Sequence, residues 1–187
     1  MDFFIYFSVF STIFVALALI RALFASFRAQ RPSDYVGLGP DFDLTQHLDG
    51  QNLCEGVIFG PTGRVISRFT AVMTGKWSGE SGVLSVDFHY DSGATQHREW
   101  TLILDGEGRF HAEADDIVGY GDGRMMGPAV RLLYTIILPQ DAGGHRLRAI
   151  DWMYLTDGGT IVNRSQFRKF GFCVAELVAT IRKAEVA

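Results

Sequence analysis

The chain has 187 residues, 48% of them hydrophobic, and a formal net charge of −4. This length provides for one domain of ordinary size with a short appendage. The negative charge, without a stripe of Lys or Arg, argues against a nucleic-acid partner. Two cysteines, Cys54 and Cys173, are too few for a disulfide framework, and the sequence leaves open whether they pair. No residue spacing indicates a metal site or a cofactor.

The first 27 residues are predicted to form a membrane anchor. Residues 3–20 carry no charge, and a helix of this length covers roughly 27 Å, close to the thickness of the hydrocarbon core. A cleaved signal peptide is the alternative, but it normally opens with a positive segment, whereas this chain opens with Asp2. Arg21, Arg28 and Arg31 follow the apolar stretch, and the positive-inside rule then places the rest of the chain in the cytoplasm.

Residues 28–42 contain Pro and Gly signals and are interpreted as a linker, and residues 43–187 as one β domain. Turn signals separate short alternating segments there, which is typical of an all-β barrel or sandwich. The alternation over residues 64–77 is longer than in an ordinary strand and favours a curved antiparallel barrel. The predicted strands cover residues 54–60, 64–77, 82–90, 94–104, 108–115, 128–138, 146–156, 159–163 and 170–182. The last segment would also make an acceptable helix, but its β-branched residues favour a strand that closes the barrel.

The hairpin of residues 82–104 has a predicted register. It places Val86 opposite Arg98 and Asp87 opposite His97. Asp87, His89 and His97 then share an outer face as metal ligands might, but such neighbours are common on solvated sheets, and we predict no metal there.

The Gly-rich run of residues 119–127 is interpreted as a turn. It fails both registers of the phosphate-binding pattern G-x-G-x-x-G, because Arg124 and Met126 stand where glycines are needed.

Two charged residues lie on apolar faces of predicted strands. Arg98 shares its face with Trp100, and Asp151 shares its face with Met153. An unpaired buried charge is too costly to keep, so each must find a partner or line a wet pocket. We predict that Asp151 is buried and paired with a guanidinium, Arg164 first and Arg98 second.

Several motifs together resemble a known bacterial family. They are Gly63-Arg64, Arg68-Phe69, Trp77, Phe88-x-Tyr90-x-x-Gly93, Arg98-x-Trp100, Asp116-Ile117-Val118-Gly119, Asp151-Trp152-Met153, Asn163-Arg164 and Lys169-Phe170-Gly171-Phe172. From about Phe42 to Arg182 the chain resembles the uncharacterised domain-of-unknown-function family 3833.

The resemblance implies a lipocalin-like, calycin-type antiparallel barrel without an established activity. Members commonly look like exported lipoproteins, which would place the barrel in the periplasm and contradicts the positive-inside expectation. This chain departs from that habit, because its first cysteine, Cys54, lies far beyond the hydrophobic segment. A single-pass protein of the bacterial inner membrane is therefore expected, with the side left open.

The leading functional hypothesis is a membrane-anchored barrel that binds a lipid-like or other small apolar ligand in its interior, as barrel sites are mostly apolar with a few placed polar groups. One alternative is a small-barrel enzyme that uses buried Asp151 with Arg98 or Arg164. Another is a solidly packed scaffold. No catalytic residue is assigned. The candidate ligand-binding residues are Phe69, Met73, Trp77, Phe88, Tyr90, Arg98, Trp100, Tyr134, Asp151, Met153, Asn163 and Arg164.

Overall fold

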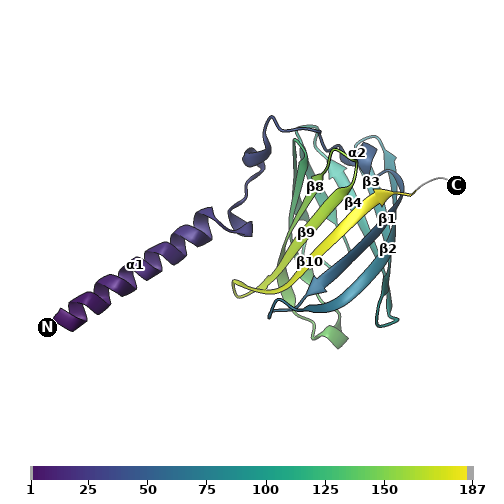
Figure 1. The fold of residues 1–187 in the computed structure, drawn as a ribbon. Helices are drawn as coiled ribbons and strands as arrows, with labels where there is room; N and C mark the ends of the chain where they lie inside the picture. The colour runs from purple at the N-terminus through teal and green to yellow at the C-terminus, as the bar shows by residue number, and fades with distance from the viewer. Residues whose placement is uncertain (1, 185–187) are drawn as a thin grey trace.

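The computed structural model describes residues 2–184, which form an apolar helix, a connecting segment and a closed β-barrel (Figure 1). The helices are α1 (Asp2–Phe24) and α2 (Leu44–His47), with 3-10 helices η1 (Phe27–Ala29), η2 (Pro32–Tyr35) and η3 (Gln140–Ala142). The strands are β1 (Gly50–Phe59), β2 (Val65–Ser78), β3 (Ser81–Tyr90), β4 (Thr95–Leu104), β5 (Arg109–Glu113), β6 (Gly121–Met126), β7 (Ala129–Ile137), β8 (Arg146–Leu155), β9 (Ile161–Lys169) and β10 (Phe172–Lys183).

The barrel is an up-and-down arrangement in which each strand pairs antiparallel with the next. β10 pairs with β1 and closes the sheet, so the predicted mainly β, antiparallel barrel is confirmed. The register predicted for the β3–β4 hairpin is also confirmed, with Val86 opposite Arg98 and Asp87 opposite His97. Side chains that alternate inward along these strands form one continuous core.

Two predictions about strands were wrong. Residues 121–126 of the expected turn form β6, and β9 runs from Ile161 to Lys169 rather than ending at residue 163. β6 needs its glycines because a neighbouring ring occupies the space that a side chain would fill. A Cβ added to Gly123 would lie 2.3 Å from the ring of Phe110 on β5. Glycine in a strand here marks close packing rather than a turn.

One end of the barrel is covered by the chain that leads into β1. Phe42, Leu44 and Leu48 are all buried there, and the short helix α2 lies over this capped end (Figure 1). Asp43 begins α2 by accepting a hydrogen bond from the Thr45 amide at 2.8 Å. Leu48, directly after α2, can pack against β2 because Gly75 has no side chain. A Cβ at Gly75 would lie 1.9 Å from the carbonyl oxygen of Leu48.

The segment between α1 and α2 packs against the outer wall of the barrel. Phe27 in η1 is buried against Ala129 and Trp152, and Trp152 is only 1% exposed although its strand position faces outward. Gln30 is held by the hydroxyls of Tyr35 and Tyr154, which donate to its side-chain oxygen at 2.5 and 2.7 Å. The expected linker is therefore attached to the barrel rather than free in solvent.

Candidate functional site

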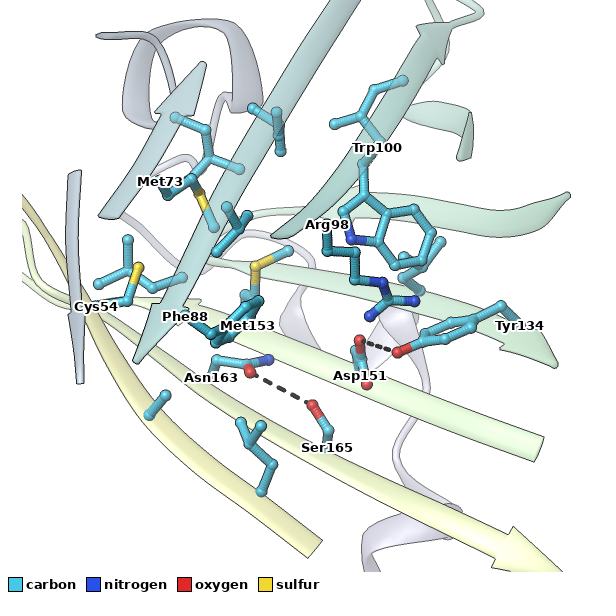
Figure 2. Close-up of a pocket in the computed structure, with 18 of the residues that line it drawn as sticks. Cys54, Met73, Phe88, Arg98, Trp100, Tyr134, Asp151, Met153, Asn163 and Ser165 are labelled. Carbon is cyan, nitrogen blue, oxygen red and sulfur yellow. Dashed lines mark hydrogen bonds between the residues drawn. The ribbon is translucent and has the colours of Figure 1, made fainter. Parts of the chain in front are cut away.

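The interior of the barrel contains a cavity of about 160 Å³. At roughly 10–15 Å³ per water, this is room for on the order of ten water molecules or an equivalent part of a ligand. Most of the lining is apolar and comes from α2 and from strands all around the barrel. Five polar side chains interrupt it and lie close together, as Figure 2 shows. This inner cluster consists of Arg98, Tyr134, Asp151, Asn163 and Ser165.

The structure brings most of the predicted ligand-binding residues together around this cavity. Those that line it are Phe69, Met73, Phe88, Arg98, Trp100, Tyr134, Asp151, Met153 and Asn163. The other three do not line it. Trp77 packs in the core over Gly82, Tyr90 donates a hydrogen bond to Gln96 at 2.8 Å, and Arg164 lies on the outer wall.

Asp151 is the group of the inner cluster with the least complete hydrogen bonding. One carboxylate oxygen, Oδ2, accepts a hydrogen bond from the Tyr134 hydroxyl at 3.1 Å. Among the described residues, the other oxygen, Oδ1, has no hydrogen-bond partner and is shielded from water. Burial raises the pKa of Asp151, and the nearby Ser165 hydroxyl, Arg98 and Tyr134 oppose that shift. The Ser165 hydroxyl lies close to Asp151 but donates to Asn163 at 3.3 Å, which leaves Oδ1 unpaired within the described part of the chain. The carboxyl is thus held in a setting that disfavours its charge.

Arg98 enters the inner cluster between two aromatic rings. Its guanidinium lies 4.2 Å from the centre of the Trp100 ring and 5.6 Å from that of Tyr134, and these two rings contact each other edge to face. Its hydrogen bonds go elsewhere, to one oxygen of Asp116 at 3.0 and 3.2 Å. Burial raises the pKa of Tyr134, so its hydroxyl stays protonated and able to donate.

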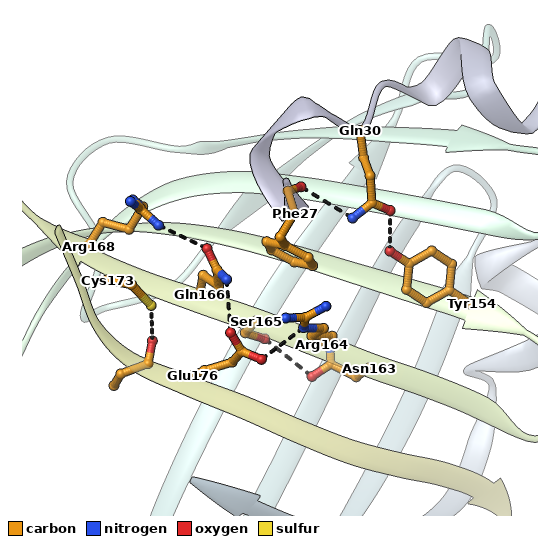
Figure 3. Close-up of polar contacts among 11 residues, drawn as sticks. Phe27, Gln30, Tyr154, Asn163, Arg164, Ser165, Gln166, Arg168, Cys173 and Glu176 are labelled. Atoms are coloured by element: carbon orange, nitrogen blue, oxygen red, sulfur yellow. Dashed lines mark hydrogen bonds and ion pairs between the residues drawn. The ribbon is translucent and has the colours of Figure 1, made fainter. Parts of the chain in front are cut away.

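The predicted pairing of Asp151 with Arg164 is wrong. Arg164 lies on the outer wall, where its Nε donates to Glu176 at 2.9 Å (Figure 3). Gln166 donates to the same carboxylate at 2.8 Å, and Arg168 donates to Gln166 at 3.0 Å. We call Arg164, Gln166, Arg168 and Glu176 the outer cluster. Successive residues of a strand point to opposite faces, so Arg164 cannot share a face with Asn163 and Ser165.

Besides the apolar lining, two residues that hydrogen-bond within the site were not among those predicted. Ser165 lines the cavity and donates to Asn163 at 3.3 Å. Extending the predicted strand beyond residue 163 would have placed Ser165 on the face of Asn163. Asp116, the partner of Arg98, lies in the loop between β5 and β6, and only its presence in the family motif pointed to it.

Both cysteines are free. Cys54 lines the cavity, and burial raises the pKa of its thiol to about 12, so it is present there as a neutral thiol. Asp87 and His97 contact each other on the outer face at 2.7 Å. Within residues 2–184, no three His, Cys, Asp or Glu side chains are grouped to hold a metal ion.

The closed antiparallel barrel and its interior cavity place the chain in the lipocalin-like class of barrels. Its family follows from sequence: residues 21–183 match the family described as "Protein of unknown function (DUF3833)", and the chain belongs to it. A search of curated proteins gives no match.

Solved structures of the same fold share little sequence with the chain. The S-type phycobiliprotein lyase CPES from Guillardia theta has a TM-score of 0.54 at 8% identity, over 77% of this chain and 92% of that one. Rv2717c from M. tuberculosis has a TM-score of 0.58 at 15% identity, over 79% and 99%. A protein of unknown function of the DUF3598 family from Nostoc punctiforme has a TM-score of 0.53 at 11% identity, over 78% and 51%. At these identities the likeness establishes the fold alone.

Proposed function

We propose that this chain is a membrane-anchored barrel that binds a small, largely apolar molecule in its interior and holds the polar group of that molecule at Asp151. The observation that carries the proposal is the carboxylate oxygen of Asp151 that has no partner among the described residues, beside an otherwise apolar cavity. A buried acceptor without a partner costs about 1–3 kcal/mol. A ligand that donates a hydrogen bond at this point removes that cost.

The site favours a ligand with a neutral or positive donor group, such as an amine, amide or hydroxyl. Arg98 does not neutralise Asp151 through a hydrogen bond, because it is bonded to Asp116. The end torsion of an aspartate is broad, so the carboxylate can turn its free oxygen toward a ligand. The aromatic rings of Phe88, Trp100 and Tyr134 supply apolar surface around this point.

The alternatives receive less support. A scaffold packed solid has no use for the cavity. An enzyme that uses Asp151 as an acid or base needs a second group to activate or receive the substrate, and among the described residues Arg98, the nearby cation, is instead hydrogen-bonded to Asp116. The interior therefore supports binding more directly than catalysis.

The anchor is proposed from α1. Residues Phe3–Arg21 have a mean hydropathy of 2.4, and none of this stretch is buried against the barrel. An apolar helix that no part of the protein covers either lies in a lipid bilayer or is removed as a signal sequence. Arg21, Arg28 and Arg31 favour a cytoplasmic barrel in a bacterial inner membrane. In a chain with Cys173→Ser and Ser92→Cys, a membrane-impermeant maleimide should then label the exposed β3–β4 turn only in permeabilised spheroplasts, and labelling of intact spheroplasts would place the barrel outside.

The binding proposal is tested with a matched pair of probes, 1-aminoanthracene and anthracene, which differ by one amine. We expect quenching of tryptophan fluorescence by both, since Trp100 lines the cavity. Asp151→Leu should weaken 1-aminoanthracene roughly tenfold or more, the value of a hydrogen bond to a charged group, and leave anthracene nearly unchanged. Native mass spectrometry of gently purified protein should show a bound small molecule that Asp151→Leu loses.

Glu176→Gln is the control, since it alters a carboxylate on the outer wall of the same barrel. It should retain both the probe affinities and the co-purified molecule. Equal weakening of both probes by Asp151→Leu would contradict the role given to the carboxylate. Failure of either probe to bind the unmodified protein, with nothing co-purified, would contradict interior binding itself.

A further inference from the structure

Large apolar side chains lie in solvent at two hairpin tips, both at the end of the barrel opposite α2. Outside α1, the two most exposed of the described large hydrophobic residues are Phe170, at 90%, in the turn between β9 and β10, and Phe172, at 76%, at the start of β10. Ile66 and Val65 follow the turn between β1 and β2 and are 65% and 50% exposed. We call these two turns with their apolar residues the hairpin tips. Exposed aromatic and aliphatic groups gathered in this way mark an interaction surface.

The backbone at Phe170 strengthens this interpretation. Phe170 has a φ of 51°, a left-handed conformation that a bulky residue rarely adopts and that glycine adopts readily. The neighbouring Gly171 accepts a hydrogen bond from Arg168 at 3.1 Å, which fixes the turn. The turn therefore holds an aromatic ring in solvent at a position where glycine would cost less. Conformational strain of this kind is typical of functional surfaces.

The two hairpin tips themselves carry only positive charge, and the acidic group near them, Asp91 of the β3–β4 turn, is paired with Arg68 at 3.1 Å. Residues 60–66 contain Arg64, residues 168–173 contain Arg168 and Lys169, and neither stretch contains Asp or Glu. Apolar side chains flanked by Lys and Arg match the interface of a bilayer, where rings insert at headgroup depth and cations meet lipid phosphates. A protein partner with an acidic rim is the rival, but the position of α1 favours lipid.

α1 leaves the barrel on the side from which the β9–β10 turn projects, as Figure 1 shows. The relation is fixed by the connecting segment, because Phe27 is buried on the outer wall and its ring lies 4.6 Å from the guanidinium of Arg164 on β9 (Figure 3). If α1 crosses the bilayer, this attachment keeps the β9–β10 turn beside the same membrane surface.

We infer that the hairpin tips form a second membrane contact, in which Phe170 and Phe172, with Ile66 of the adjoining β1–β2 tip, enter the headgroup layer of an anionic bilayer while Lys169 and Arg64 bind phosphate. The inference rests on the proposed anchoring by α1. It makes the barrel a body docked on the bilayer at two points rather than one tethered by a single helix.

Spin labels in the full chain, reconstituted in vesicles of phosphatidylethanolamine and phosphatidylglycerol, test this contact. Cys173 is first replaced by Ser, and Cys54 stays because it is buried. Single cysteines then replace Phe10 in α1, Phe170 at the tip, or Ser92 in the polar β3–β4 turn at the same end of the barrel. Collision with oxygen, which concentrates in lipid, is compared with collision with a water-soluble nickel chelate.

We expect the labels at positions 10 and 170 to collide with oxygen several-fold more, relative to nickel, than the label at position 92. A label at position 170 that behaves like position 92, while position 10 lies in lipid, overturns the second contact and leaves the anchor intact. A label at position 10 that is fully accessible to nickel overturns the anchor as well. Phe172→Ser should lower the oxygen preference at position 170 several-fold, and an unchanged preference would contradict insertion of the ring pair.

Discussion

The inner and outer clusters meet at β9, which sends alternate side chains to both, yet they differ in how their charges are satisfied. In the outer cluster Glu176 accepts hydrogen bonds from both Arg164 and Gln166. In the inner cluster Asp151 keeps one oxygen without a partner among the described residues. A fold that pairs a carboxylate completely on one side of a wall and incompletely on the other indicates different roles. On the proposed function, the outer cluster stabilises the wall of the barrel and the inner cluster is left for a ligand.

The largest change in the free energy of unfolding is expected when Arg98, the cation of the inner cluster, is replaced. Arg98→Met removes the partner of Asp116 and leaves that partly buried carboxylate unpaired. Because the side chain of Arg98 is only 16% exposed, we expect a loss of about 3–5 kcal/mol in the free energy of unfolding, the usual cost of breaking a buried pair from one side. Urea unfolding in detergent micelles, followed by tryptophan fluorescence, measures it.

Adding Asp116→Asn to Arg98→Met is the matched control, because it removes the carboxylate that the first change leaves unpaired. The double variant should recover a substantial part of the loss. A loss below about 1 kcal/mol for Arg98→Met alone would mean that the inner cluster is as well solvated as an exposed ion pair, and the contrast between the two clusters would disappear.

Replacement of Asp151 is expected to change the free energy of unfolding by a smaller amount and to increase it. Because burial raises the pKa of Asp151 above 3.8, the folded chain binds this proton more tightly than the unfolded chain does. The resulting stability is present at acidic pH and declines as the pH rises from about 3.8 through the pKa of the folded state. Asp151→Asn should therefore raise the free energy of unfolding at pH 7 by about 1–3 kcal/mol.

The pH dependence separates this effect from a change in packing. The gain from Asp151→Asn should shrink toward pH 4, because the aspartic acid becomes neutral there as well. Unfolding curves at several pH values measure the difference between the two chains. A difference that is constant with pH, or a loss of stability at pH 7, would show that Asp151 is satisfied in the folded chain.

The smallest effect is expected in the outer cluster. Glu176→Gln removes the ion pair with Arg164, whose side chain is 43% exposed, and glutamine keeps hydrogen-bonding capacity toward its neighbours. We expect a change within about 1 kcal/mol that decreases further in high salt. Thermal unfolding at low and high salt checks it. A loss as large as that of Arg98→Met would show that the outer cluster carries the structure instead.

Much of the fold could be predicted because strands with one apolar face alternate visibly. The β3–β4 register followed from matching two such faces around a short turn, and barrel closure followed from the β-branched residues of the last strand. β6 could not be predicted in this way, because Gly121 and Gly123 hide the alternation. Glycine is needed at these positions because Leu132 and Phe110 on neighbouring strands fill the space that a side chain would take. Such contacts between strands cannot be inferred from the local sequence.

The sequence predicted which charged residues face the interior better than it predicted which residues pair with them. Alternation alone identified Arg98 and Asp151 as inward charges. The partner of Arg98 could not be found from strand patterns, because Asp116 lies in a loop and loops have no fixed face. Arg164 was placed on the wrong face because the predicted strand ended at residue 163. Had the strand been extended to Lys169, its alternation would have put Asn163 and Ser165 inside and Arg164 outside.

The pairing of β1 with β10 that closes the barrel also sets an order of events during synthesis. Asn52 pairs with Lys183, so the free edge of β1 finds its partner only when the last strand has been made. α1 has by then long left the ribosome, and on the proposed topology the chain waits at the membrane with one sheet edge open. Such distant pairing slows folding and leaves the edge exposed to other chains. A nascent chain that stops before β10 would keep two open edges on an apolar sheet, and so would be a substrate for aggregation or proteolysis rather than a smaller working barrel.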